Sequence, residues 1–156
     1  MRDVPGAVEI IRGGDVISYL GFNAATRDWA AKNGATIERF LAGVSEADQW
    51  MRKNPKRAAQ VATRWVPGLK QEVAEAAMDF NIQQADRRLS ANNYAALHSA
   101  QQRLHRLGFL KDTFDVNKHI EPKHILKVMA DHPALFADLP PIPEAAQIRP
   151  GYVFKA

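Results

Sequence analysis

The chain has 156 residues, of which 46% are hydrophobic and 24% are charged, with a formal net charge of +4. This composition is typical of one globular domain with its own core, and it excludes a disordered, collagen-like or low-complexity chain. The absence of cysteine excludes disulfides, Cys-ligated metal centres and a thiol nucleophile. No apolar run approaches the roughly 20 residues that cross a bilayer, and the first residues lack the apolar region of an export signal.

Two short runs of β-branched and aromatic residues open the chain, at 7–11 and 16–22. Gly13-Gly14-Asp15 lies between them and supplies the positive φ angles that a chain reversal needs. The pattern predicts a short β-hairpin or strand pair within residues 7–24. Helical patterns fill residues 26–131. The predicted fold class is therefore α+β, mostly α, with the strand pair followed by about five to six helices.

Helix signals begin directly after this segment. Thr26 is expected to cap a short helix over 27–32 that ends at Asn33-Gly34, and Thr36 is the predicted cap of a longer amphipathic helix. The apolar residues of that helix recur at helical spacing: Ile37, Phe40, Leu41, Val44, Ala47 and Met51. Asn54-Pro55 predicts the start of the next helix, because proline suits the first helical position.

The buried stripe of that next helix is predicted to be Ala58, Val61, Ala62 and Trp65. A further helix is expected from Leu69 to Phe80, and residues 81–89 are interpreted as an extended connection because they show no helical period. All three tryptophans fall in or beside predicted helices, where they more often fill a core than stack on a ligand: Trp29, Trp50 and Trp65.

The second half of the chain carries the clearest helix boundary. Ser90 is expected to cap a helix whose apolar stripe is Tyr94, Leu97, Leu104 and Leu107. Gly108 followed by Phe109 predicts a Schellman end for that helix. A last helix is expected to begin at Pro122 and to bury Ile125, Leu126 and Met129. Residues 133–156 are rich in proline and are predicted to form an extended or mobile tail.

The histidines do not show the spacing of a metal site. His98 and His105 lie on one face of a predicted helix but about 10 Å apart along its axis, so they cannot share a metal ion. His119 and His124 lack the spacing of the zincin helix. We interpret the histidines as surface residues and expect no metal and no cofactor. The sequence also lacks a nucleophile elbow and a phosphate-binding loop.

Several residues are suited to binding an anion, although each has a structural interpretation as well. The amides of Gly13-Gly14 can face an anion or form a tight turn, and Thr26-Arg27 can bind an anion or only cap a helix. Four arginines invite a nucleic-acid interpretation, but no aromatic residue interleaves with them and Asp86 lies among them: Arg87, Arg88, Arg103 and Arg106. A solvated helix face explains these arginines better, so we expect no nucleic-acid partner.

Three groups of residues together resemble a known family. They are Ile11-Arg12-Gly13-Gly14-Asp15-Val16 with Tyr19-Leu20-Gly21-Phe22 and Arg27-Asp28-Trp29-Ala30; Phe40-Leu41, Glu46-Ala47, Trp50 and Asn54-Pro55 with Ala58-Ala59; and Leu107-Gly108-Phe109-Leu110-Lys111 with Phe114-Asp115-Val116. In this order and spacing they resemble the C-terminal half of the substrate-binding proteins of nitrate/sulfonate/taurine ABC importers. The likeness covers roughly residues 8–130.

This resemblance implies a two-lobed type II periplasmic-binding fold, of which residues 1–132 would be a partial lobe and 133–156 a tail. It implies a truncated or partial solute-binding component, located in the periplasm, that delivers a small anion such as a sulfonate, taurine or nitrate to an ABC permease. The family's first lobe and export signal would precede Met1. Apolar surface exposed by the missing lobe would then favour a homo-oligomer.

The residues expected at the solute are Arg12, Gly13, Gly14, Ser18 and Tyr19. The Arg12 side chain would neutralise an oxyanion, the glycine amides would cradle it, and the two hydroxyls would donate hydrogen bonds. Enzymes that share this fold, a thiamine-pyrimidine synthase and an aryl sulfinate desulfinase, depend on cysteine, so the chain is not expected to be an enzyme. The alternative hypothesis is a free-standing helical protein-interaction module with weak affinity for anions or nucleic acid.

Overall fold

The structure is a computed structural model that describes residue 6, residues 21–83 and residues 85–155. Six α-helices and three 3₁₀ turns are assigned in these ranges: α1 (Arg27–Lys32), α2 (Gly34–Lys53), α3 (Pro55–Trp65), α4 (Gln71–Gln83), α5 (Ala91–Arg106), η2 (Val116–Lys118), α6 (Lys123–Asp131), η3 (Pro133–Phe136) and η4 (Glu144–Ala146). The described residues contain no β-strand.

The predicted α+β fold class is therefore wrong for the described part of the chain, which is all-helical. Most of the strand pair expected over residues 7–24 lies outside the described residues, and residues 21–24 have no regular secondary structure. A β-branched pattern forms a strand only where it finds a partner edge, and an isolated two-stranded hairpin is marginally stable. For residues 21–24, the described helices offer no sheet edge on which to pair.

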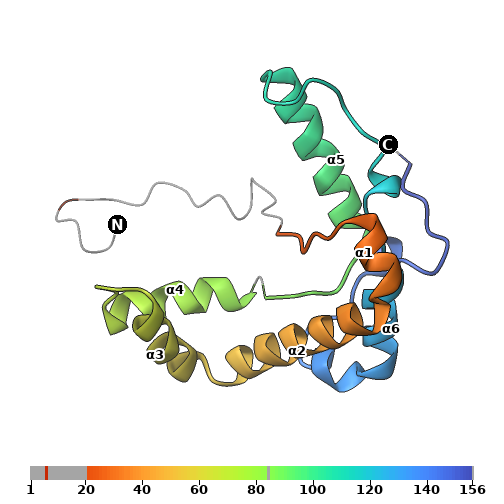
Figure 1. Ribbon diagram of the computed structural model, residues 1–156. Coiled ribbons are helices and arrows are strands. Elements are labelled where there is room, and N and C mark those ends of the chain that lie inside the picture. Colours follow the sequence, from red (N-terminus) through yellow and green to blue (C-terminus); the bar gives the residue numbers. More distant parts are fainter. Residues whose placement is uncertain (1–5, 7–20, 84, 156) are drawn as a thin grey trace.

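The helices form two arms that meet near α1 and α6 (Figure 1). The first arm consists of α2, α3 and α4: the long helix α2 packs against α6 and η3, and the α3–α4 pair extends from the C-terminal end of α2. Helix α5 projects away from this arm and is contacted by η2 and η4. Residues 85–90 connect the two arms without forming a helix.

Two small hydrophobic clusters hold the structure together. One centres on Tyr94, Val116 and Ile148, and the other on Ile125, Val128 and Phe136. Phe136 and Ile148 belong to the proline-rich segment after residue 132, which is extended apart from its 3₁₀ turns. Because that segment supplies buried side chains to both clusters, it is a packed part of the molecule.

Three predicted helix boundaries are confirmed. Pro55 is the first residue of α3, and the side chains of Ser90 and Asn93 form a capping box at the start of α5. Gly108 has a φ of 77°, and its N–H donates to the His105 carbonyl over 3.0 Å. The Phe109 N–H donates to the Leu104 carbonyl over 2.9 Å, which completes a Schellman end.

Other boundaries differ from the prediction. Helix α2 begins at Gly34, two residues before the predicted cap Thr36, because Asn33 accepts the first helical hydrogen bonds through its carbonyl. Gly34 is consequently helical, and the left-handed helix end expected there is absent. Helix α4 runs to Gln83, so the extended connection is shorter than the predicted 81–89.

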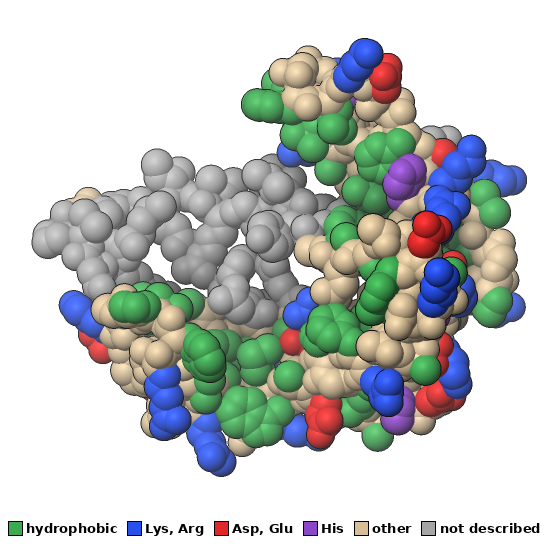
Figure 2. Space-filling model, in the orientation of Figure 1, with side chains coloured by type: hydrophobic (Ala, Val, Ile, Leu, Met, Phe, Trp, Pro, Cys, Tyr) green, Lys and Arg blue, Asp and Glu red, His purple; other side chains and the backbone are tan. Residues whose placement is uncertain are grey.

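Large apolar side chains lie open on α1 and on the first arm, which corrects the expectation that the tryptophans fill a core. Trp65 is 81% exposed, and Trp29 and Trp50 are also exposed. The buried residues of α2 are Ser45 and Asp48, although the apolar periodicity predicts a different stripe. Figure 2 shows hydrophobic side chains on the surface of this arm. Among the described residues, no second layer covers these faces.

Candidate functional site

The five residues predicted to bind the solute, Arg12, Gly13, Gly14, Ser18 and Tyr19, lie outside the described residues. The other predicted anion position, Thr26-Arg27, precedes a helix of only six residues. Thr26 makes no capping hydrogen bond through its side chain, and Arg27 donates to the Lys118 carbonyl over 3.3 Å. Arg27 therefore links α1 to η2, which is a structural role.

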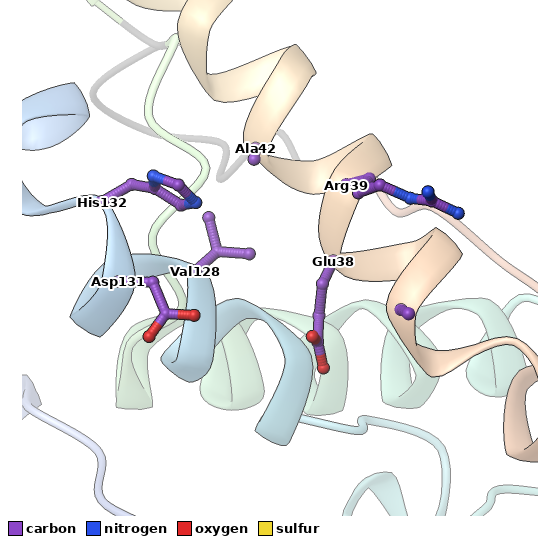
Figure 3. Close-up of a pocket in the computed structure, with 7 residues that line it drawn as sticks. Glu38, Arg39, Ala42, Val128, Asp131 and His132 are labelled. Carbon is purple, nitrogen blue, oxygen red and sulfur yellow. The ribbon is translucent and has the colours of Figure 1, made fainter.

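A shallow cavity of about 340 Å³ lies in the groove between α2 and α6 (Figure 3). It is lined by Ala35, Glu38, Arg39, Ala42, Val128, Asp131 and His132. Helical spacing places Glu38 and Ala42 on one face of α2, four residues apart. In Figure 3 the carboxylates of Glu38 and Asp131 point to the same side of the groove, whereas Arg39 points away from it.

Both carboxylates of this groove already have partners. Asp131 accepts a hydrogen bond of 2.6 Å from the Lys127 ammonium, which lowers the pKa of Asp131 and raises the pKa of Lys127. Glu38 lies 3.0 Å from Nδ1 of His124 on α6. With the carboxylate oxygen as acceptor, Nδ1 is the ring nitrogen that donates this hydrogen bond to Glu38.

His124 is the exception to the prediction that the histidines are surface residues, because it is only 7% exposed. Its ring packs against the first residue of α2: a Cβ built on Gly34 would lie 3.0 Å from Cε1 of His124. Nε2 of the ring is buried and has no hydrogen-bond partner. Because Gly34 has no Cβ, the imidazole of His124 can pack against the start of α2. Its hydrogen bond with Glu38 then joins α6 to α2.

The chemistry open to this pair is limited by its burial. A carboxylate that orients an imidazole is the arrangement of a general base, but such a base must reach a reacting group at about 3 Å. The free nitrogen of His124 is buried and has no hydrogen-bond partner among the described residues. In the part of the chain that is described, no three His, Asp or Glu side chains gather in a way that could hold a metal ion. The Glu38–His124 pair is therefore best explained as a structural contact.

A second polar network joins α2 to the connection between the arms. Asp48, which is 2% exposed, accepts a hydrogen bond of 2.6 Å from Arg87. Arg52 forms two hydrogen bonds with Asp138, of 2.8 and 3.1 Å, and donates to the Ala85 carbonyl over 2.7 Å. These bonds tie α2 to residues 85–87 and to the proline-rich segment.

This network also accounts for two of the four arginines that suggest a nucleic-acid surface. Arg87 is paired with Asp48, and Arg88 is paired with Asp86 over 2.7 Å and donates to the Pro140 carbonyl over 2.8 Å. Both guanidinium groups serve internal contacts. The prediction that these arginines lie on a solvated helix face is wrong for this pair, since residues 85–90 are not helical.

Neither the Glu38–His124 contact nor the Asp48–Arg87 contact could be predicted from the sequence. Glu38 and His124 are 86 residues apart, and Asp48 and Arg87 are 39 residues apart. Charged residues at that separation give no periodic signal. Asp48 also lies off the apolar stripe of its helix, which is the usual mark of an exposed position.

Comparison of the chain with protein-family models, with curated proteins and with solved structures finds no match in any of the three. Across the described residues, no helix combines the length and the apolar character that a membrane span requires.

Proposed function

We propose that this chain is part of the solute-binding component of an ABC importer for a small anion such as a sulfonate, taurine or nitrate. The observation that carries the proposal is the ordered series of motifs from Ile11 to Val116. Each motif is short and common, but their order and spacing along more than 100 residues resemble one class of binding protein.

The described helices are compatible with this proposal in two respects. The helix pair that the resemblance places around Asn54-Pro55 corresponds to α2 and α3, which meet at that dipeptide. The apolar stripe of α3 is only partly covered: Ala58 is buried, whereas Val61 and Trp65 are exposed. Amphipathic helices with an open apolar stripe are expected where the chain packs against further polypeptide, as a partial lobe would.

The proposed site consists of Arg12, Gly13, Gly14, Ser18 and Tyr19. An arginine, two glycine amides and two hydroxyls can all donate hydrogen bonds to the oxygens of a sulfonate or nitrate. In this role the chain binds the solute and passes it to the permease, and it catalyses no reaction itself.

The test is thermal unfolding of the purified chain with taurine, methanesulfonate, nitrate and bicarbonate. A ligand at 100 times its dissociation constant stabilises the native state by about 2.7 kcal/mol, so a shift in midpoint is measurable. We expect one of these anions to raise the midpoint of the wild-type chain. The shift should vanish in Arg12→Ala and persist in Arg64→Ala, which removes an exposed arginine of α3. An absence of shift with every anion contradicts solute binding by this chain.

The second candidate function, a helical protein-interaction module, is favoured by the exposed apolar side chains of the first arm. The largest of these are Phe40, Trp50 and Trp65. Aromatic residues are enriched at protein interfaces. The nucleic-acid version of this candidate is weakened by the internal pairing of Arg87 and Arg88. Retention on DNA that falls steeply with salt would support it, and no retention at low salt would exclude it.

A further inference from the structure

The free end of α5 is an exposed knob of apolar and basic side chains, formed by residues 103–112 and called here the α5 knob. Two of its apolar side chains are among the most open in the described chain, Leu107 at 64% and Phe109 at 77% exposed, and Leu104 is 41% exposed. In Figure 1 α5 projects away from the other helices, and the knob is its far end. Side chains at that position can touch a flat surface before the rest of the molecule does.

The backbone of the α5 knob is held by its own hydrogen bonds. The N–H groups of Phe109 and Leu110 both donate to the Leu104 carbonyl, over 2.9 and 3.3 Å. Nδ1 of His105 lies 3.1 Å from the Leu110 carbonyl, and because a carbonyl only accepts, the imidazole donates. The apolar side chains are thus presented by a preformed turn, so that binding does not have to order the backbone.

Three cations flank the apolar side chains of the knob: Arg103, Arg106 and Lys111. All three are exposed, and within the described residues none has an ion pair, in contrast to Arg52, Arg87 and Arg88. Arginines in the last turn of a helix complement its dipole, which explains Arg103 and Arg106 in part. The dipole explains neither Lys111, which lies beyond the helix, nor the exposure of Leu107.

We propose that the α5 knob binds the surface of an anionic lipid bilayer. Three cations against one acid, Asp112, give the knob a positive charge that favours an anionic partner. Three apolar side chains fall far short of the roughly 800 Å² per partner of a standard protein interface. A bilayer interface needs no such area, because each inserted apolar side chain and each nearby cation contributes separately. This inference stands on the geometry of the knob and is independent of the solute-binding proposal.

The experiment is flotation of the purified chain with two kinds of vesicle. One contains phosphatidylcholine alone, and the other contains about 30% phosphatidylglycerol, which gives the vesicle a negative surface potential. We expect flotation with the anionic vesicles only, and less flotation at higher salt. Arg103→Gln with Arg106→Gln should weaken binding about 25-fold, since each cation near an anionic surface contributes about fivefold. Leu107→Ser with Phe109→Ser should weaken it at least about tenfold.

The matched control is Trp65→Ser, which removes the most exposed apolar side chain of α3 and leaves the knob intact. It should bind the anionic vesicles as the wild type does. All four knob positions are exposed, so unchanged thermal midpoints will show that the variants remain folded. No flotation with anionic vesicles overturns the proposal, and so does equal loss of binding in Trp65→Ser and in the Leu107→Ser/Phe109→Ser variant.

Discussion

The side-chain amide of Gln101 forms both of its hydrogen bonds with the main chain of Phe114. Its Nε2 donates to the Phe114 carbonyl over 2.8 Å, and its Oε1 accepts from the Phe114 N–H over 2.7 Å. Gln101 is only 2% exposed and lies on α5, whereas Phe114 belongs to the segment that returns from the α5 knob. One buried amide thus replaces the sheet or helix partner that the main chain of Phe114 lacks.

Gln101→Ala should lower the free energy of unfolding by about 2 kcal/mol, because two main-chain groups of Phe114 lose their partner at about 1 kcal/mol each. The measurement is urea denaturation followed by circular dichroism. Gln102→Ala is the matched control, since within the described residues the side chain of this neighbouring glutamine forms no hydrogen bond. Equal stability of the two variants would show that water satisfies Phe114 as well as Gln101 does.

Asn117 makes the same pair of bonds with the C-terminal segment. Its Nδ2 donates to the Phe154 carbonyl over 3.0 Å, and its Oδ1 accepts from the Phe154 N–H over 2.8 Å. We predict that Asn117→Ala increases hydrogen exchange at residues 152–155 at least about tenfold, with little change elsewhere, because local opening involves only the bonds of that segment. Exchange measured by mass spectrometry checks this, with Asn92→Ala on the exposed side of α5 as the control. Unchanged exchange would mean that the rings of Tyr152 and Phe154, which pack on Tyr94, hold the segment alone.

The helices that could be predicted from the sequence are those whose ends carry local chemistry. Pro55, Ser90 and Gly108 each act through main-chain groups within a few residues, so their effect does not depend on the rest of the fold. Gly34 shows the limit of that reasoning. An Asn-Gly pair is a common helix end, yet here the glycine is the first residue of α2, and the imidazole of His124 lies where a Cβ would have to go.

Burial was harder to predict than helix formation. The apolar stripe of α2 predicts one buried face, but the described chain buries Ser45 and Asp48, since Arg87 from the connection lies over Asp48. Apolar periodicity shows which face prefers burial and cannot show whether another element is available to cover it. The predicted anion site lies outside the described residues, so its five residues remain a prediction from sequence.

Acid should weaken the junction between α2 and the proline-rich segment. The hydrogen bond from Arg52 lowers the pKa of Asp138 from 3.8 to about 2. A carboxyl group whose pKa is lower in the folded state adds stability above its ordinary pKa, and this stability is lost as pH falls from about 4 toward 2. Asp138→Asn should therefore lower the midpoint of thermal unfolding at pH 7 and flatten its dependence on pH between 4 and 2. Asp112→Asn alters an exposed carboxylate that forms no ion pair with any described residue, and it should leave that dependence unchanged. A wild-type slope in Asp138→Asn would show that other carboxylates govern the acid response.

Two glycines of α2 should respond in opposite directions to the same substitution. Alanine favours a helix by up to about 1 kcal/mol relative to glycine, so Gly43→Ala should stabilise the chain, because a Cβ at position 43 meets nothing within 4 Å. At Gly34 a Cβ would lie 3.0 Å from Cε1 of His124, closer than an ordinary contact of about 3.5 Å. Gly34→Ala must push the imidazole away from its position beside Glu38, and it should destabilise the chain by about 1 kcal/mol despite its better helix propensity. Thermal unfolding of both variants at pH 7 checks the prediction. Stabilisation by both substitutions would show that His124 moves aside freely, in which case its contact with Glu38 does not hold α6 against α2.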